Sequence, residues 1–529
     1  MRGLVAKISP KITPMAKHLL KSGVIVSAMT LISRVLGLVR EVVLANLLGA
    51  GMGADLFFVA QKIPNFLRRL FAEGAFAQAF VPVFVEYQLK RSQEEVLQLL
   101  NKVAGTLGLI VLGLTVLVLI AAPWVTTVYA PGFRDDPVKF ELAVYMLRIT
   151  FPYLLFISLT ALAGSVLNTR NRFAVPAITP VFLNVCLIIA GVWVAPELDR
   201  QAVAMAWAVL IAGVVQLAFN LPFLWREGLL PRPVWGWKDE GVQRILKLML
   251  PAMFGVSITQ ISLMLDVIFL SFLEEGSVSW LYYADRLLEF PLGLFGIAIA
   301  TVILPSLSRQ HSSEDAASFQ STIDWALRFL TLIGLPAMIG LGMLADGLAL
   351  TLFQHGATTV QDAANIADAL IFYSLGLMSF MSIKVLATGF FGRQDTKTPV
   401  KFALIAVAFN MVANAILIWP LQYLGLALAT TLSSTLNATL LFRMLYKRGI
   451  YRPQAGWGSW LLKVGTACSA MAVVIYLVHP GNEAWAIADH WQRILFTGQT
   501  VAAGGASYFA MLWLMGMRIS QLRGYTPSP

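Results

Sequence analysis

The sequence predicts an all-α polytopic membrane protein with about 14 transmembrane helices. Of its 529 residues, 58% are hydrophobic and only 13% are charged, and the mean hydropathy is +0.74. A soluble domain is usually about 45–50% apolar and about 25% charged, so this chain lacks the polar surface that water requires. The apolar runs are too long for strands and do not alternate with period two. We therefore expect helices that are solvated largely by lipid.

Each predicted span is a segment of about 20 mostly apolar residues, the length that crosses a bilayer core as a helix. These segments are centred near residues 35, 72, 110, 153, 184, 212, 258, 292, 333, 375, 408, 434, 470 and 505. Residues 1–22 precede the first segment and are basic, and no small-residue cleavage site follows them. We therefore expect a cytoplasmic N-terminal segment rather than a removed signal peptide.

The connections between the apolar segments alternate in charge. Lys and Arg concentrate in every second connection, for example around residues 90–102, 226–244 and 443–452, whereas 49–54 and 479–489 are poor in them. Cytoplasmic connections of membrane proteins carry this excess of Lys and Arg. The pattern predicts a bacterial inner-membrane protein with both termini in the cytoplasm. It also accounts for the net charge of +11 without nucleic acid as a partner.

An internal repeat relates the two halves of the chain. Gly53 opens a charged segment that is closed by a proline, and Gly276 opens a similar segment 223 residues later (276 − 53). The run Arg170–Pro176 matches Arg393–Pro399 at the same offset. Six helices per half would keep both halves in the same orientation, as in parallel repeats with a substrate site between two lobes. The predicted parts are an N-lobe (23–231), a C-lobe (232–452) and two extra C-terminal helices (453–529).

Ionisable residues crowd the second apolar segment, which contains Asp55, Lys62, Arg68, Arg69 and Glu73. Exposure of all five to lipid would cost on the order of 10–15 kcal/mol. Helical spacing places Asp55, Lys62 and Arg69 on one stripe. The segment is therefore predicted to line a polar interior, although Lys62, Arg69, Glu73 and Lys384 can also be explained as residues that reach a membrane interface or form internal salt bridges.

Arginine is the most informative of these charges. Its planar guanidinium binds phosphate oxygens bidentately and does not lose its proton, so an excess of arginine between two lobes suits a diphosphate. The arginines that we assign to this role are Arg34, Arg40, Arg68 and Arg286. Asp285 and Glu289 are spaced to hold Arg286 in place, or to release it when substrate binds.

A second set of polar residues lies in the C-terminal half. Asp266 is a lone carboxylate in an apolar run, Asn410 and Asn414 are one helical turn apart, and Thr430 lies in the next segment. Carboxylate, amide and hydroxyl oxygens suit Na⁺ or H⁺ coupling. The alternative is that Asp266 is protonated or hydrogen-bonded inside the helix bundle.

Several long motifs resemble the MurJ (MviN) family of lipid II flippases, within the MOP exporter superfamily. The motifs are Ser33–Glu41, Ala54–Ala60, Pro64–Pro82, Gly164–Thr169, Gly276–Pro291 and Arg393–Pro399. They occur in order over essentially the whole chain after the basic N-terminus.

The resemblance implies two six-helix lobes around a cationic cavity, two extra helices that form a groove for the undecaprenyl tail, and alternating access. It implies that Arg34, Arg40, Arg68 and Arg286 are cavity arginines, that Asp55, Arg69, Asp285 and Glu289 are also linked to function, and that Asn168 is a cavity asparagine. It also implies a Na⁺ site at Asp266, Asn410, Asn414 and Thr430. Where such a site has a second carboxylate, this chain has Asn414, which lowers the charge of the site.

We therefore expect a transporter that moves lipid II, the undecaprenyl-diphosphate-linked peptidoglycan precursor, from the cytoplasmic to the periplasmic leaflet. The alternatives are a flippase for another polyprenyl-diphosphate glycan and a cation-coupled exporter of the same superfamily. An enzyme is disfavoured because the connections are short and the five histidines show no metal-ligand spacing. No phosphate-binding loop of the G-x-x-x-x-G-K-[ST] type occurs, so the candidate coupling ions are Na⁺ and H⁺. Expected partners are membrane lipids and proteins of cell-wall synthesis or division.

Overall fold

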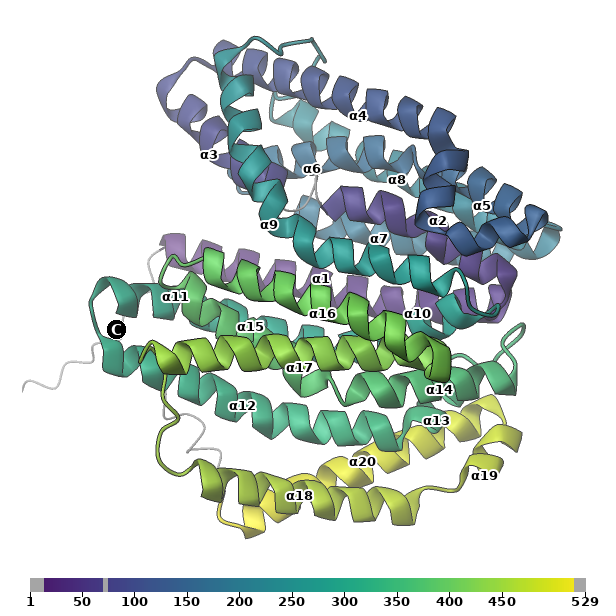
Figure 1. Cartoon of the computed structure of the whole chain (residues 1–529). Helices are drawn as coiled ribbons and strands as arrows, with labels where there is room; N and C mark the ends of the chain where they lie inside the picture. The colour runs from purple at the N-terminus through teal and green to yellow at the C-terminus, as the bar shows by residue number, and fades with distance from the viewer. Residues whose placement is uncertain (1–13, 70–74, 518–529) are drawn as a thin grey trace, which may run out of the picture. The chain divides into compact units, whose positions relative to one another are not determined.

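The computed structural model describes residues 14–69 and 75–517, and it is built from α-helices (Figure 1). No β-strand occurs in these two ranges, which confirms the all-α prediction. Glu73, residues 1–13 of the predicted N-terminal segment and residues 518–529 of the last predicted part lie outside the described residues.

The helices of the first half run from α1 to α8. Their bounds are α1 Pro14–Leu48, α2 Met52–Arg68, α3 Ala75–Lys90, α4 Gln93–Tyr129, α5 Pro137–Thr150, α6 Tyr153–Thr169, α7 Ala174–Ile189 and α8 Gln201–Arg226. The second half continues with α9 Glu240–Leu270, α10 Ser277–Pro291, α11 Ile297–Ser312, α12 Ala316–Met343, α13 Ala345–Leu352, α14 Val360–Ser374, α15 Leu377–Phe391, α16 Lys397–Leu421 and α17 Tyr423–Lys447. The C-terminal helices are α18 Trp457–Val478, α19 Asn482–Ile487 and α20 His490–Leu514.

Many of these helices can cross a membrane. Within the described residues, 9 helices are long and apolar enough, and the pair α14 and α15, which is bent by 42°, gives a tenth. This confirms a polytopic membrane protein, while the count of about 14 spans stays a prediction.

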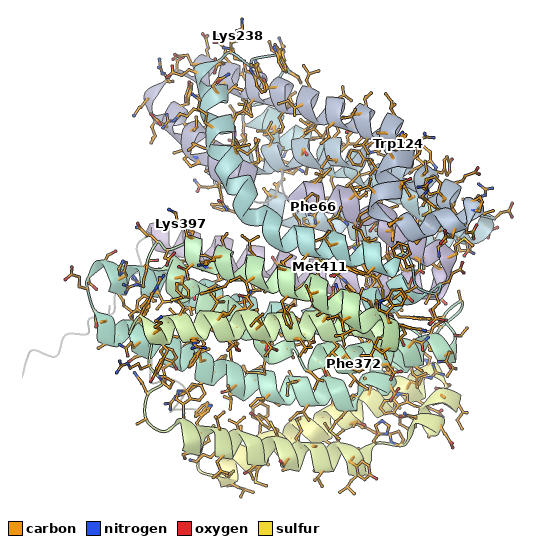
Figure 2. The ribbon with its side chains drawn as sticks, viewed as in Figure 1. Phe66, Trp124, Lys238, Phe372, Lys397 and Met411 are labelled. Atoms are coloured by element: carbon orange, nitrogen blue, oxygen red, sulfur yellow. The ribbon has the colours of Figure 1, made fainter. Side chains whose placement is uncertain are left out.

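The outward surface of the long helices is apolar (Figure 2). On α4, Ile120, Trp124 and Val128 follow one another at a spacing of four and are 74%, 76% and 73% exposed. Residues at this spacing share one helix face. A soluble monomer rarely exposes a continuous stripe of large apolar side chains, so this face is one that lipid covers.

The predicted repeat recurs in the helix boundaries. α5 and α14 begin 223 residues apart (360 − 137), and so do α7 and α16 (397 − 174). The long helix α4 corresponds to α12 and α13 together, because 316 − 93 and 352 − 129 are also 223. The offset first seen in two short motifs therefore describes the secondary structure of both halves.

The turn before α7 and the turn before α16 have the same backbone conformation. Asn171 and Gln394, again 223 apart (394 − 171), both have a φ of 60°. A positive φ is uncommon outside glycine. The N–H of Arg172 donates to the Leu167 carbonyl at 2.9 Å, and that of Asp395 donates to the Phe390 carbonyl at 3.0 Å. Two equal departures from ordinary geometry at one offset indicate a common local fold.

An ion pair follows each of these turns, with opposite polarity in the two halves. In the first half Arg172 Nε lies 2.8 Å from Glu227 Oε1, and in the second half Arg448 Nη1 lies 2.7 Å from Asp395 Oδ2. The acid and the base have exchanged places between the turn and the end of the following helix pair. The repeat therefore preserves the contact although it does not preserve the residues.

The chain folds into two compact units, and each is described by itself. The first contains the described residues up to Val43 together with 64–121 and 147–253. The second contains Leu44–Ile63, Ala122–Met146 and the described residues from Phe254 onward. Two segments of the N-terminal half thus belong to the same unit as the C-terminal half.

A polar network lies between α6, α7 and α8 in the first unit. Tyr153 donates its hydroxyl to Gln216 Oε1 at 3.3 Å, and Gln216 Nε2 donates to the Thr179 carbonyl at 3.1 Å. Asn220 Nδ2 donates to Thr179 Oγ1 at 3.3 Å. Buried polar groups need such partners, so the network fixes α7 against its neighbours.

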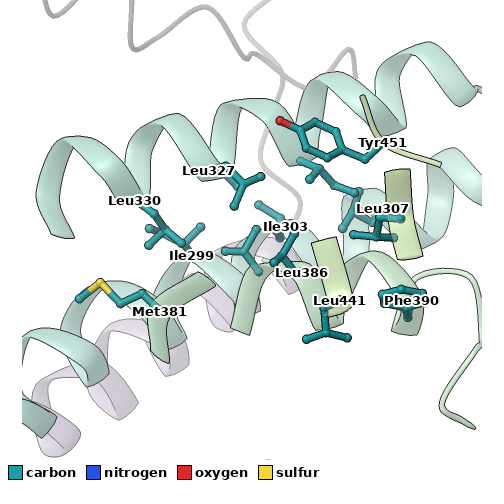
Figure 3. Close-up of a cluster of buried hydrophobic side chains, with 14 of the residues drawn as sticks. Ile299, Ile303, Leu307, Leu327, Leu330, Met381, Leu386, Phe390, Leu441 and Tyr451 are labelled. Atoms are coloured by element: carbon teal, nitrogen blue, oxygen red, sulfur yellow. The ribbon is translucent and has the colours of Figure 1, made fainter. Parts of the chain in front are cut away.

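The second unit has a continuous hydrophobic core formed by α11, α12, α15 and α17 (Figure 3). Its fully buried side chains include Ile303, Leu307, Leu330, Met381, Leu386, Phe390, Leu441 and Tyr451. Apolar positions on four helices therefore converge on one region.

The extra C-terminal helices are attached to this unit at two points. Near the start of α18, Asp324 Oδ1 accepts hydrogen bonds from the Tyr451 hydroxyl at 2.8 Å and from Trp457 Nε1 at 2.7 Å. On α20, the buried Arg493 donates to four backbone carbonyl oxygens, those of Leu350, Gln354, Trp485 and Ala486. Carbonyls at the end of α13 thus serve as partners for a buried cation.

The Asp395 ion pair makes a prediction about pH. Burial opposes ionisation of Asp395, but hydrogen bonds from Thr398 and Arg448 outweigh it and lower the pKa of the carboxyl from 3.8 to about 2. Because the folded-state pKa is below the ordinary one, the contribution to stability is complete above about pH 4 and is lost as the pH falls toward 2. Asp395→Asn should lower the free energy of unfolding at pH 7 by about 1 kcal/mol, allowing for solvent screening.

The measurement is the thermal unfolding of the purified protein in detergent between pH 7 and about pH 2.5. The difference between wild type and Asp395→Asn should shrink as the pH falls, whereas Asp199→Asn in an exposed connection should have no effect at any pH. A difference that stays constant over this range would contradict the assignment.

Candidate functional site

The predicted site residues are divided between the two units. Arg34, Arg40, Arg68, Arg69 and Asn168 lie in the first unit, and Asp55, Asp266, Asp285, Arg286, Glu289, Asn410, Asn414 and Thr430 lie in the second.

Arg40 is the most constrained arginine of the first unit. Its Nη1 donates to Asn184 Oδ1 on α7 at 2.9 Å, and its Nη2 forms an ion pair with Glu41. The Arg40 side chain is 17% exposed, whereas that of Glu41 is only 3% exposed. A buried carboxylate and an amide on a second helix therefore hold this guanidinium.

The other predicted residues of the first unit are more accessible. Arg34 is exposed on α1, and Asn168 is exposed near the end of α6. Arg68 is the last residue of α2, and both it and Arg69 are half-buried. They are described residues whose side chains remain accessible enough to meet a polar ligand.

Arg286 is held by residues of its own helix, α10. Its Nη1 donates to Glu289 Oε2 at 2.6 Å, and its Nη2 donates to Asp285 Oδ2 at 3.1 Å. The guanidinium also lies over the ring of Tyr282, 4.9 Å from the centroid, which adds a cation–π contact. Tyr282 in turn stacks on Phe58 of α2, with ring centroids 3.8 Å apart. The predicted contact of Arg286 with two carboxylates is present in this geometry.

Asp55 is buried at the junction between α2 and the start of α10. Its Oδ2 accepts a hydrogen bond from the N–H of Gly276 at 2.8 Å, and its Oδ1 accepts from the N–H and the hydroxyl of Ser279 at 2.9 and 2.6 Å. Free N–H groups at a helix start attract a carboxylate. Asp55 therefore caps α10 from another helix, across 221 positions of sequence.

Gly276 is required at this junction. Its φ is +95°, and a Cβ at this position would lie 2.6 Å from the carbonyl oxygen of Ala50. Only glycine adopts this conformation without strain and leaves room for the α2 segment. The glycine that marks the sequence repeat thus also lets Asp55 reach α10.

Asp266 joins the predicted cation-site residues in the second unit. Asn414 Nδ2 donates to Asp266 Oδ1 at 2.8 Å. Asn410, with its amide oriented to satisfy both ends, donates to the same oxygen at 3.3 Å and accepts from the Thr430 N–H at 3.3 Å. The side chains of Asn410 and Asn414 are buried. Sequence positions from three helices therefore converge, with both amides turned to donate to the carboxylate.

The donor set suits a hard monovalent cation, since it contains a carboxylate, two amide oxygens and a hydroxyl. Rotation of the two amides would present their oxygens toward Asp266. Lys62 on α2 also interacts electrostatically with Asp266. An internal ammonium group is therefore close enough to balance this carboxylate without an ion.

Sequence reasoning missed Asn184. It lies in the apolar run of α7 and contacts Arg40, 144 positions away. The available signal was a lone amide in an apolar segment, the same signal that pointed to Asp266.

Comparisons with known proteins decide the family. A family model described as "Lipid II flippase MurJ" matches residues 44–496. A Vibrio cholerae protein named a probable lipid II flippase MurJ is 49% identical over 97% of this chain and 99% of its own length. The lipid II flippase MurJ of Burkholderia cenocepacia is 39% identical over 96% of this chain and 99% of its own.

The chain belongs to the lipid II flippase MurJ family. A solved structure of lipid II flippase MurJ in an inward closed conformation matches with a TM-score of 0.77 and 25% identity, over 92% of this chain and 98% of that one. An inward-facing multidrug resistance MATE transporter of the MOP superfamily matches with a TM-score of 0.65 at 15% identity, which shows a shared fold. Membership in the MurJ family makes this chain a flippase, a transporter rather than an enzyme.

The Asp55 cap makes a prediction about stability. Asp55→Asn removes the charge and turns an amide N–H toward a backbone N–H, so the free energy of unfolding should fall by about 1–3 kcal/mol. Ser279→Ala removes only the hydroxyl contact and should cost about 0.5–1.5 kcal/mol. Thermal unfolding of both purified variants in detergent measures the order. Equal stability of Asp55→Asn and wild type would show that the cap does not hold α10.

Proposed function

We propose that this chain carries lipid II from the cytoplasmic to the periplasmic leaflet of the bacterial inner membrane by alternating access. The observation that carries the proposal is the family match over residues 44–496, with relatives that align over nearly their whole length. An alignment of this extent includes every helix from α2 to α19.

The proposed ligands of the diphosphate are the arginines. Arg34, Arg40 and Arg68 would contribute from the first unit, and Arg286 from the second. A guanidinium binds two phosphate oxygens at once and stays charged at any physiological pH. Arg69, Asp55, Asp285, Glu289 and Asn168 complete the proposed set, with Asp285 and Glu289 setting how easily Arg286 is released.

We further propose that residues 23–231 and 232–452 act as two lobes. The extra helices, in residues 453–529, would hold the undecaprenyl tail. In support, α18 and α20 pack against each other and still expose large apolar side chains, such as Leu462, Tyr476 and Phe509. A polyprenyl chain would cover these with no loss of polar contacts. The polar head could then pass between lobes while the tail stays in lipid.

The proposed orientation has both termini in the cytoplasm, in accord with the excess of Lys and Arg in alternate connections. In that orientation the membrane potential, negative inside, favours outward movement of an anion by about 2.3 kcal/mol per charge per 100 mV. Membrane lipids and proteins of cell-wall synthesis or division are the proposed further partners. Na⁺ or H⁺ at Asp266 is the proposed coupling ion.

The arginine assignment is tested by complementation. Arg40→Ala and Arg286→Ala should each abolish growth of a strain depleted of its own lipid II flippase, because a phosphate ligand is lost while protein levels stay normal. Arg172→Ala, which removes an exposed arginine at a turn, should support growth. Exposure of lipid II at the outer leaflet, followed after rapid inactivation of the protein, identifies the transported lipid. Full growth of both cavity variants would sink the assignment.

The coupling proposal has its own test. Asp266→Asn should abolish any dependence of transport on Na⁺, because the amide removes the anionic ligand. Lys62→Met should strengthen that dependence, because it removes the internal positive charge that competes for Asp266. Asp368→Asn, an exposed carboxylate on α14, is the control. A sodium response that is unchanged in Asp266→Asn would exclude this residue from coupling.

A further inference from the structure

Asn184 is a buried amide with a defined partner at each end. It is 5% exposed, its Oδ1 accepts from Arg40 Nη1 at 2.9 Å, and its Nδ2 donates to the Ser33 carbonyl at 3.0 Å. Ser33 and Arg40 are two turns apart on α1, and Asn184 lies on α7. One side chain therefore connects α7 to the face of α1 that carries Arg40.

The bond to Ser33 determines which end of the amide meets Arg40. A carbonyl oxygen accepts only N–H groups, so the Asn184 Nδ2 must face Ser33 and the Oδ1 must face the guanidinium. Gly37 lies on the same face of α1, and a Cβ there would be 3.9 Å from Asn184 Nδ2, an ordinary contact. The orientation of the acceptor is thus set by the backbone of α1 itself.

The guanidinium has a second acceptor in Glu41, which binds Nη2. A free arginine side chain carries about 2 kcal/mol of rotamer entropy, and binding is weakened by whatever part of it must be lost. Two acceptors on separate nitrogens fix the plane of the guanidinium in advance. Only one of them is charged, so the pair orients Arg40 without surrounding it with two carboxylates.

We propose that Asn184 is a positioning residue for substrate recognition, which directs the Arg40 guanidinium toward the diphosphate of the lipid. The inference rests on the proposed function, in which Arg40 meets that group. Asparagine suits this role because it is neutral. A carboxylate at this position would hold Arg40 at least as firmly, but it would compete with phosphate oxygens for the same N–H groups.

The experiment measures the binding of undecaprenyl diphosphate to the purified full-length chain in nanodiscs. Asn184→Leu, which has a similar shape and no hydrogen bonds, should weaken binding about tenfold. Asn184→Asp, which keeps an acceptor for Arg40, should also weaken it, although a purely structural bond to Arg40 would be preserved. Asn184→Asp also serves if Asn184→Leu does not yield folded protein.

A matched control is available in the same unit. Asn220 is a fully buried amide on α8 whose bonds go to Thr179 and Gln216 rather than to an arginine. Asn220→Leu should lower the melting temperature and leave the affinity unchanged. Weakened binding in Asn220→Leu equal to that in Asn184→Leu would mean that any buried amide of this unit has the same effect, and the proposal would fall.

A double-mutant cycle separates the positioning role from the role of Arg40. In an Arg40→Ala background, Asn184→Leu should have no further effect, since the group that it positions is gone. A further tenfold loss in that background would overturn the positioning role and leave the proposed function intact. If Arg40→Ala alone binds like wild type, Arg40 does not meet the diphosphate, and both the positioning role and that part of the proposed function fail.

Discussion

The structure depends on one constraint, that a charge within a lipid-solvated chain must have a partner of opposite sign or a set of hydrogen bonds. The backbone supplies many of these partners. Asp55 is bound by N–H groups at the start of α10, and Arg493 is bound by carbonyls at the end of α13. Both choices agree with the helix dipole, which is positive at the start of a helix and negative at its end. The charges thereby join elements that would otherwise meet only through apolar contacts.

Much of the fold could be predicted from the sequence because the information is local. Apolar runs gave the helices, and two short motifs gave the offset of 223 residues that the helix boundaries and the turns at Asn171 and Gln394 share. The division into compact units could not be predicted. Leu44–Ile63 belongs to the second unit through contacts such as Asp55 to Ser279 and the Ala357 N–H to the Asn46 carbonyl at 2.9 Å. Periodicity carries no information about partners more than two hundred positions apart.

The candidate site divides in the same way. The contacts of Arg286 follow from spacing on one helix, because Asp285 and Glu289 are its neighbours in sequence. The contacts of Arg40 do not, since Asn184 is on another helix and no motif singled it out. For Asp266 the residue types could be selected from sequence, but the orientation of the two amides could not. Hydrogen-bond direction depends on what lies at the far end of each amide, and only the folded chain determines that.

The partners of the two central arginines differ in charge, which gives the arginines different parts in a transport cycle. Arg40 has one carboxylate and one amide, so its group is formally neutral, whereas Arg286 has two carboxylates, so its group is formally −1. A diphosphate that approaches Arg286 must therefore displace or separate at least one carboxylate, while at Arg40 it meets a guanidinium that is already oriented. Binding at Arg40 needs little rearrangement, and binding at Arg286 is linked to a change in the contacts of α10. The helix that Asp55 caps is thus also the helix whose internal ion pairs the substrate would have to break.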